Sequence, residues 1–404
     1  MSPLFFIDPK TFTFGYAFNS PQGDILDVIP ISTRNMAPEI KLAILIIVAL
    51  VTAVVLLLNN PSFGGKIRGN RLKRIHSSPN YGKGKFKNSV STDMNPSNKL
   101  MFRAITSFIK GDKRRKPEKP LPNLPIDKEL LNNPVEGVGV TWLGHSTYIL
   151  TINGIKVLVD PVLSKRAAPF SFSGPKAFPY TNPYPPEDLP TTDILLVTHD
   201  HYDHLDYKTI LELQGSGKIK HVITTLGVGA HLEKWGVAPG RITELDWWET
   251  TERNGLVFTA TPSRHFSGRG LGNRFSTLWA SFVIKSKSGN LFIGGDSGYY
   301  EGFREIGEKF GPFDLTILEC GQYGEAWPYI HMMPEQTVRA HLDLKGKVLL
   351  TVHWGKFSLS LHPWTEPVER LLKSAEENDA DVVTPKIGET FFLGGELPGE
   401  KWWR

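Results

Sequence analysis

The residues best suited to chemistry in this 404-residue chain lie in one short run, from Thr198 to His204. The run holds three histidines and two carboxylates in seven residues, and it follows an apolar stretch at residues 194–197. Histidine is the commonest metal-binding side chain, and His and carboxylate groups together suit catalytic zinc and similar ions. A solvated loop after a buried strand has no need of three histidines at this spacing. The run therefore predicts a metal-binding loop with candidate ligands at His199, His201, Asp203 and His204.

Read as H-x-H-x-D-H, this run resembles the metal-binding motif of the metallo-β-lactamase superfamily. The resemblance implies three further ligands downstream, each placed after a strand of its own. Candidates stand in the expected order at His265, Asp296 and His353, and each follows an apolar, β-branched stretch. A single histidine after a strand usually has no metal to bind, so the assignment depends on the matches taken together.

The resemblance also implies how these ligands would be shared between two metal ions. Two groups of three would each hold one ion, namely His199, His201 and His265 for the first and Asp203, His204 and His353 for the second. Asp296 would bridge the pair, which places it among the catalytic residues as well. Neutral imidazoles suit zinc, and a shared carboxylate offsets the repulsion between two dications. We expect two Zn²⁺ ions, although other divalent ions suit the same ligands.

Four short stretches bring the resemblance closer to one branch of the superfamily. Residues 140–147 (VTWLGHST), 159–161 (VDP), 331–335 (HMMPE) and 353–355 (HWG) are similar to the phospholipases D that hydrolyse N-acyl phosphatidylethanolamine and to their bacterial homologues. The similarity extends over residues 137–395. It implies a phosphodiesterase that uses metal-activated hydroxide to release phosphatidate and N-acylethanolamine from a phospholipid. The ascorbate-6-phosphate lactonases share the WLGH and DP elements, so hydrolysis of a lactone or a soluble phosphoester is the alternative.

Further side chains are candidates for contact with the substrate. His331 matches a histidine that the phospholipase family places near the scissile phosphate, where it can donate a proton to the leaving group. In that family a glutamine commonly precedes this histidine, whereas Ile330 precedes it here. The candidate substrate-binding residues are His145, Arg269 and His362. For His145, support of the metal ligands is the stronger expectation, and the alternatives are a structural role for His362 and a solvated surface position for Arg269.

The sequence around these residues alternates between short apolar runs and helical patterns. Residues 138–143, 147–150 and 155–160 have the pattern of strands, and residues 335–342 and 366–378 have that of helices. Such alternation predicts an α/β protein with its site at the ends of strands. The resemblance implies the four-layer αββα metallo-β-lactamase sandwich, with the metals at one edge of the two sheets.

The positive charge of the chain is concentrated in one segment. Residues 61–119 hold 16 Lys and Arg against 3 Asp and Glu, a net charge of +13, so the remainder of a chain at +5 carries −8. Its polar, Pro- and Gly-rich composition predicts a basic linker over residues 61–135, ahead of a hydrolase domain over residues 136–404. The charge suits a membrane surface. Because this segment is separate from the cleft and has few interleaved aromatics, we expect no nucleic-acid partner.

An uncharged apolar run at residues 42–58 is long enough to cross a membrane. We assign residues 41–60 to one transmembrane anchor rather than to a core helix or a cleaved signal peptide, because the run has no polar face and no cleavage site follows it. Basic residues follow it closely, so the positive-inside rule places the hydrolase domain in the cytoplasm. Residues 1–40 form an extension of uncertain status, in which Met36 is a candidate initiator that the intact mass of native protein would test.

Two further expectations concern partners of the chain. Residues 100–109 (LMFRAITSFI) predict either a helix that lies in a membrane interface or one packed on the domain. Besides a membrane and a phospholipid substrate, the remaining expected partner is a second copy of the chain, since relatives of this family can dimerise. Cys320 is the only cysteine, so no disulfide within the chain can form.

Overall fold

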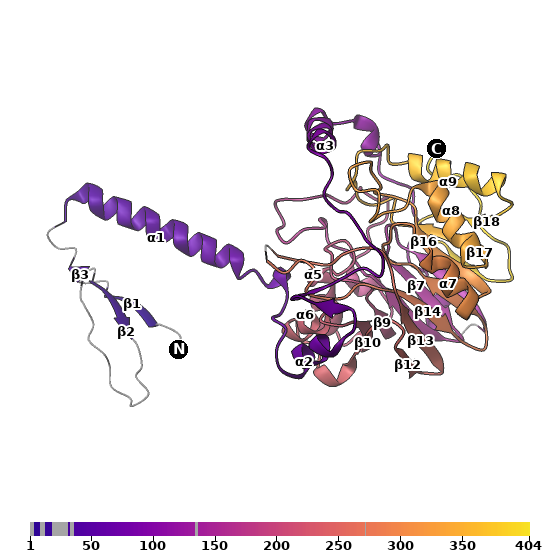
Figure 1. Ribbon diagram of the computed structural model, residues 1–404, viewed down its shortest axis with the longest axis horizontal. Helices are drawn as coiled ribbons and strands as arrows, with labels where there is room; N and C mark the ends of the chain where they lie inside the picture. The colour runs from indigo at the N-terminus through magenta and orange to yellow at the C-terminus, as the bar shows by residue number, and fades with distance from the viewer. Residues whose placement is uncertain (1–3, 9–12, 18–30, 33–35, 134–135, 271) are drawn as a thin grey trace. The chain divides into compact units, whose positions relative to one another are not determined.

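The structure is a computed structural model that describes the chain except for residues 1–3, 9–12, 18–30, 33–35, 134–135 and 271. It divides into two units, Met1–Asn60 and Pro61–Arg404 (Figure 1). The first unit consists of a small sheet and one long helix among its described residues, whereas the second holds all the candidate site residues.

The first unit contains a long apolar helix, α1 (Pro38–Leu58). A proline occupies its first turn, where the missing N–H costs no hydrogen bond. The stretch Pro38–Leu57 has 20 residues and a mean hydropathy of 3.0, and its most apolar window is unburied, unlike the core helix of a soluble protein. Helix α1 is thus a candidate membrane span by length and composition alone. The preceding antiparallel strands are β1 (Leu4–Asp8), β2 (Thr13–Ala17) and β3 (Ile31–Ser32).

Two seven-stranded sheets form the frame of the second unit. The order of the first sheet is β11-β10-β9-β8-β7-β6-β19 and that of the second is β12-β13-β14-β15-β16-β17-β18. The strands of the first sheet are β6 (Val138–Trp142), β7 (Tyr148–Ile152), β8 (Ile155–Val159), β9 (Thr192–Leu196), β10 (Ile219–Thr225), β11 (Ile242–Leu245) and β19 (Thr390–Phe392). Those of the second are β12 (Thr250–Arg253), β13 (Leu256–Thr261), β14 (Ser281–Lys285), β15 (Asn290–Ile293), β16 (Phe313–Glu319), β17 (Gly346–Val352) and β18 (Asp381–Val383).

Both sheets are mixed, and each is antiparallel in one half and parallel in the other. Strands β8 to β11 run parallel in the first sheet, and β15 to β18 run parallel in the second. Because the carboxyl ends of parallel strands meet at one edge, side chains that follow them along the chain are brought together in space.

Helices pack against these sheets. Helix α8 contacts β16, β17, α7 and α9, while α9 contacts β18 and α6 contacts β11. Figure 1 shows α7, α8 and α9 beside the strands of the second sheet. The helix bounds are α5 (Tyr207–Gly215), α6 (Gly229–Lys234), α7 (Gly302–Phe310), α8 (Pro334–Asp343) and α9 (Glu366–Glu377). The arrangement confirms an α/β sandwich of two mixed sheets.

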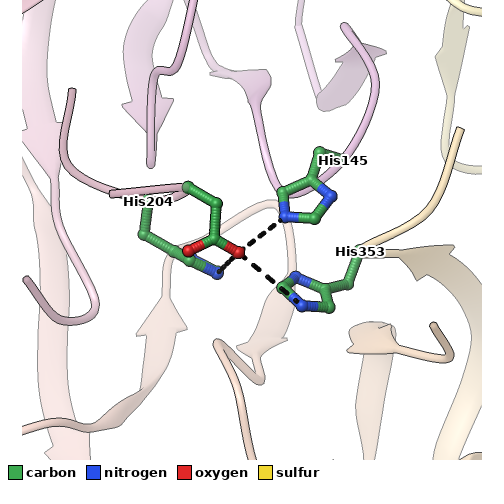
Figure 2. A group of neighbouring side chains, drawn as sticks. His145, His204 and His353 are labelled. Carbon is green, nitrogen blue, oxygen red and sulfur yellow. Dashed lines mark hydrogen bonds and ion pairs between the residues drawn. The ribbon is translucent and has the colours of Figure 1, made fainter. Parts of the chain in front are cut away.

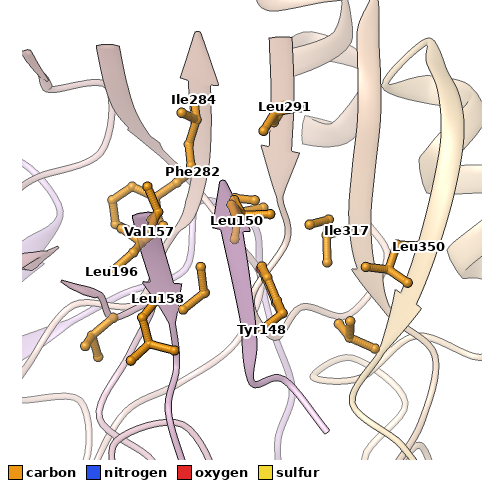
Figure 3. Close-up of a cluster of buried hydrophobic side chains, with 14 of the residues drawn as sticks. Tyr148, Leu150, Val157, Leu158, Leu196, Phe282, Ile284, Leu291, Ile317 and Leu350 are labelled. Carbon is orange, nitrogen blue, oxygen red and sulfur yellow. The ribbon is translucent and has the colours of Figure 1, made fainter. Parts of the chain in front are cut away.

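The main hydrophobic core contains side chains from both sheets. Figure 3 shows Leu150 and Val157 of the first sheet near Phe282, Ile284 and Ile317 of the second. All five side chains are buried. Strands covered on both faces read as nearly continuous apolar runs, as the buried end of β9 (ILL) and the Val197 that follows it do.

The basic segment belongs to the same compact unit as the two sheets, which differs from the expectation of a separate linker. Its side chains Ile75 and Phe86 join the main core, and Arg71 forms ion pairs with Glu233 at 2.8 Å and with Glu244 at 2.5 Å. A few apolar side chains in the core, together with acidic ion-pair partners, thus attach this segment to the domain despite its polar composition. Its elements are η1 (Pro61–Phe63), α2 (Gly69–Ser77), β4 (Tyr81–Gly82), β5 (Lys85–Phe86), α3 (Asn98–Lys110), η2 (Lys113–Arg115) and α4 (Lys128–Asn132).

Candidate metal centre

The candidate ligands all lie just beyond the ends of strands. The loop that carries His199 follows β9, His265 follows β13, Asp296 follows β15 and His353 directly follows β17. The hairpin between β6 and β7 adds His145, whose φ of 53° turns the backbone into the left-handed region. Backbone hydrogen bonds join this hairpin to the loop after β17, because His145 N–H donates to Trp354 O at 2.8 Å and His353 N–H donates to His145 O at 3.0 Å.

A first group of ligand atoms comes from His199, His201, His265 and Asp296, and these atoms all lie within 4.8 Å of one another. His201 Nδ1 lies 3.0 Å from His199 Nε2 and 3.2 Å from His265 Nε2. Asp296 Oδ2 lies 3.7 Å from His199 Nε2 and 3.6 Å from His265 Nε2. The structure therefore brings together the ligands that the sequence predicts for the first ion.

A second group gathers around the carboxylate of Asp203. Figure 2 shows His145, His204 and His353 turned towards this carboxylate, whose Oδ2 lies 2.9, 3.7 and 3.9 Å from their respective Nε2 atoms. These four residues also offer ligand atoms within 4.8 Å of one another. The group contains the ligands predicted for the second ion, and it adds His145, which contacts Asp203 as a supporting residue would.

Asp296 stands between the two groups. Its Oδ2 lies 3.1 Å from His204 Nε2, and its Oδ1 lies 3.2 Å from His353 Nδ1. One carboxylate therefore reaches histidines of both groups, as the predicted bridging role requires. Burial raises the pKa of this carboxyl to about 6, against the opposing effect of His204.

Outer hydrogen bonds hold the imidazoles in place. Thr198 Oγ1 lies 3.0 Å from His199 Nδ1, and Asp160 Oδ2 lies 2.8 Å from His204 Nδ1. Asp160 also accepts a hydrogen bond from Thr198 N–H at 2.9 Å, so one buried carboxylate positions both ends of the loop. Metal-binding histidines typically use their second nitrogen in this way. The VDP stretch pointed to Asp160 as a marker of resemblance, whereas its contact with His204 could not be foreseen.

The donor atoms at this site fit divalent metal ions. Hydrogen-bond partners are lacking among the described residues for the buried atoms His201 Nε2, His204 Nε2, His353 Nε2 and Asp296 Oδ1. Buried polar atoms without hydrogen bonds are costly, so their convergence here fits the binding of a cation. Burial also lowers the pKa of His201 to about 4 and holds the pKa of His199 and His353 well below the usual value. Neutral imidazole is the form that binds metals.

His331 lies beside the two groups and is held by a residue that sequence reasoning missed. Its Nδ1 lies 2.6 Å from Glu319 Oε2, and the other oxygen of Glu319 accepts the N–H of Ser297 at 2.8 Å. The ring centroid of His331 is 5.1 Å from that of His353. Burial raises the pKa of Glu319 and lowers that of His331. Glu319 ends strand β16, and its position as the one carboxylate after a buried apolar run is the signal that could have found it.

Two predicted substrate-binding residues have structural partners instead. Arg269 is buried, and its guanidinium donates to the carbonyl oxygens of Asp200 at 2.7 Å, Leu205 at 2.6 Å and Ser62 at 2.9 Å. Arg269 thus braces the metal-binding loop from behind, which differs from a role in holding substrate. A buried guanidinium that donates to backbone carbonyl oxygens supplies hydrogen bonds that those oxygens would otherwise lack.

His362 is likewise engaged by the backbone. Its Nε2 accepts the N–H of Gln322 at 2.9 Å, and its Nδ1 donates to Pro363 O at 2.8 Å. The ring also stacks on Tyr323 with 4.4 Å between centroids. With both nitrogens used, His362 fits the structural alternative better than substrate binding.

The basic segment contributes directly to the site through Asn88, which was also missed. Asn88 accepts the N–H of His265 at 3.0 Å and donates to the carbonyl oxygen of His265 at 2.9 Å. Trp279 Nε1–H donates to the same side-chain oxygen at 3.1 Å. Asn88 therefore fixes the backbone of the candidate ligand His265 although the two are distant in sequence. No local sequence pattern predicts such a contact.

A buried lysine near the site gives a test of stability against pH. Burial lowers the pKa of Lys356 to about 8, and Asp206 only partly opposes this shift. The folded pKa lies below the unfolded value of about 10.4, so the cost of burying the cation is fully present below about pH 8 and vanishes above about pH 10. Relative to Lys356→Met, the wild-type protein should therefore gain about 3 kcal/mol of stability over this range. Melting curves of both proteins at several pH values measure it, and a constant difference would contradict the shift.

The comparisons with known proteins agree with this geometry. A family model described as a beta-lactamase superfamily domain matches residues 156–354. An uncharacterised protein of Mycobacterium tuberculosis is 41% identical over 331 residues, which cover 81% of this chain and 88% of that protein. The N-acyl-phosphatidylethanolamine-hydrolyzing phospholipase D 1 of Caenorhabditis elegans is 32% identical over 295 residues, or 66% of this chain and 83% of that protein. The solved structure of a possible metal-dependent hydrolase from Veillonella parvula has a TM-score of 0.50 at 18% identity, and covers 64% of this chain and 100% of that one.

Fold and site together define a metal-dependent hydrolase with its centre at the ends of two facing sheets. The chain belongs to the metallo-β-lactamase superfamily and has homologues named as N-acyl-phosphatidylethanolamine phospholipases D. The resemblance found in the sequence is thereby confirmed.

Proposed function

We propose that this protein is a membrane-anchored phosphodiesterase of the phospholipase D type. Its substrate would be an N-acyl phosphatidylethanolamine-like lipid, which it hydrolyses to phosphatidate and an N-acylethanolamine. The observation that carries the proposal is the pair of ligand groups with His331 beside them, in a chain 32% identical to a relative named for this activity.

The proposed ligands are the seven that the sequence indicated. They are His199, His201 and His265 for one ion, Asp203, His204 and His353 for the other, and Asp296 for both. The proposed ions are two Zn²⁺, which imidazole-rich sites suit. When bound, such ions supply Lewis acidity, which lowers the pKa of water and polarises phosphoryl oxygens. His145 would keep Asp203 in position through its 2.9 Å contact.

The role of His331 is the transfer of a proton to the leaving oxygen. Hydrolysis at phosphorus forms a bond to the oxygen of water and breaks the bond to the ethanolamine oxygen, which must then gain a proton. Because Nδ1 of His331 is engaged by Glu319, Nε2 is the nitrogen left to exchange a proton with substrate. Glu319 acts as a positioning residue, since its contact with Ser297 fixes the carboxylate that orients the ring.

The proposed location is a single-pass membrane protein with α1 as its anchor. The length and mean hydropathy of α1 support this, and the basic residues that follow it favour a cytoplasmic hydrolase domain. The predicted anchor boundaries at residues 40 and 60 and the predicted homodimer stay predictions.

The test is direct turnover by the full chain. Detergent-purified, zinc-loaded protein is incubated with N-acyl phosphatidylethanolamine, and the products are followed by mass spectrometry. We expect phosphatidate and N-acylethanolamine, both absent with His201→Ala. Binding of two metal ions without any turnover of this lipid would overturn the substrate assignment, and lactones and soluble phosphoesters would then be assayed with the same preparation.

A further inference from the structure

Helix α3 (Asn98–Lys110) turns its apolar side away from the protein. The side chains of Met101, Ile105 and Phe108, at helical spacings of four and three residues, are 44%, 50% and 60% exposed. Phe102 and Ile109, seven residues apart, extend the same face and are 69% and 78% exposed. No residue of this helix is buried. Large contiguous apolar surfaces of this kind mark sites of contact with proteins or membranes.

The opposite side of α3 is the one that faces the hydrolase domain. Leu100, Ala104 and Thr106 are half-buried, and they line a cavity of about 610 Å³ beneath the helix. Trp327 and Met333 line the same cavity from the domain side. Met333 follows His331 by two positions in the chain. The helix is therefore placed with its half-buried side chains inwards and its most exposed apolar side chains outwards, near the loop of a proposed catalytic residue. Figure 1 shows α3 at the periphery of its unit, away from the two sheets.

The ends of the helix are defined, and cations flank its apolar face. Ser97 caps the N-terminus by accepting the N–H of Leu100 at 3.3 Å, and Gly111 ends the helix with a φ of 68°. The cations at the ends of the helix are Lys99, Lys110 and Lys113, while Arg103 lines the cavity beneath the helix and Arg114 pairs with Asp112 at 2.7 Å. An apolar face bordered by cations is the signature of a helix that lies in the interface of an anionic membrane.

We propose that α3 is a second membrane contact of this chain, lying in the headgroup region of an anionic bilayer with Phe102, Ile105 and Ile109 in the lipid. A bilayer fits better than a protein partner because cations outnumber the one acidic residue, Asp112, around the helix, and because the chain has a candidate membrane span of its own. The inference rests on the proposed membrane location. It adds that the surface next to the loop of His331 is the one that meets lipid.

The experiment uses the full chain reconstituted in vesicles of phosphatidylcholine and phosphatidylglycerol. Cys320 is buried and so does not react with a thiol label, which allows single-site labelling. An environment-sensitive fluorophore is attached at Ile109→Cys or Phe102→Cys. The matched control is Lys373→Cys on α9, because the side chain of Lys373 is also 78% exposed. Nitroxide-bearing lipids then report whether each label lies within the bilayer.

We expect a blue-shifted emission and quenching by nitroxide lipids at both positions of α3, with neither change at Lys373→Cys. Vesicles of phosphatidylcholine alone should give weaker quenching, because the flanking cations then have no anionic headgroups to meet. Labels on α3 that stay as solvated as the control would overturn the proposal. So would a blue shift that grows with protein density without quenching, since a second copy would then cover this face.

The readout does not depend on turnover, so it separates this inference from the proposed activity. Quenching without hydrolysis of N-acyl phosphatidylethanolamine would leave the membrane contact in place and remove the substrate. Hydrolysis without quenching would support the substrate and overturn the membrane contact of α3. A double variant, Phe102→Asp with Ile109→Asp, changes exposed positions only and should melt like the wild type while losing the quenching of a label at Ile105→Cys.

Discussion

Replacing Asp296 by alanine is expected to lower hydrolysis by about 10³-fold or more and to reduce the bound metal. Its two carboxylate oxygens lie 3.1 to 3.7 Å from histidines of both ligand groups, so one substitution removes the contact that joins them. Metal ions stabilise the charge of a transition state by several kcal/mol, and each 1.4 kcal/mol corresponds to about a tenfold change in rate. Metal content by mass spectrometry and turnover of the zinc-loaded protein measure both effects.

The matched control for Asp296→Ala is Asp314→Ala. Asp314 also lies on a strand of the second sheet, but it forms a surface ion pair with Lys347 at 2.8 Å. That variant should keep its metal and its rate, because surface ion pairs contribute little. If Asp296→Ala retained two metal ions and full activity, the bridging assignment would be refuted. A circular dichroism spectrum like that of the wild type shows that the loss is local to the site.

The positions of the candidate ligands at strand ends were predictable because they depend on local pattern. Each follows an apolar run that ends a strand, and the strands β9, β13, β15 and β17 lie where those runs predicted. Parallel strand ends meet at one edge, which is why residues as distant as His199 and His353 converge. The sequence could therefore indicate which residues gather without showing how far apart their atoms lie.

The residues that escaped prediction are those whose role depends on distant partners. Asn88 contacts His265 across 177 positions of the chain, and Glu319 contacts His331 across a loop. Arg269 has the charge expected of an anion-binding residue in a loop. Its guanidinium nevertheless donates hydrogen bonds to three backbone carbonyl oxygens. The basic segment was expected to be a linker because its composition is polar, whereas a few side chains such as Ile75 fasten it to the core. The average composition of a segment does not reveal single side chains that pack into the core.

Replacing Glu319 by glutamine should lower kcat by about 10²-fold while leaving KM and metal content unchanged. Positioned proton transfer contributes about 10² to 10⁴ to the rate of many enzymes. Glutamine keeps the size of the side chain, but its amide is a weaker partner for the His331 ring than a carboxylate is. Steady-state kinetics and metal analysis of the full chain measure the effect. The matched control is Glu335→Gln in α8, since Glu335 pairs with Arg370 at 2.8 Å and should not affect the rate.

A double-mutant cycle decides whether Glu319 acts through His331 or on its own. If its function is to orient that ring, Glu319→Gln adds nothing once His331 has been replaced by alanine, because the group being positioned is gone. Losses that multiply in the double variant would show an independent role, for which the third group of neighbouring ligand atoms, at Asp296, Glu319, His331 and His353, offers a route. Reduced metal content in Glu319→Gln would point the same way. The contact of 2.6 Å between Glu319 Oε2 and His331 Nδ1 favours the first outcome, since it joins the two side chains directly.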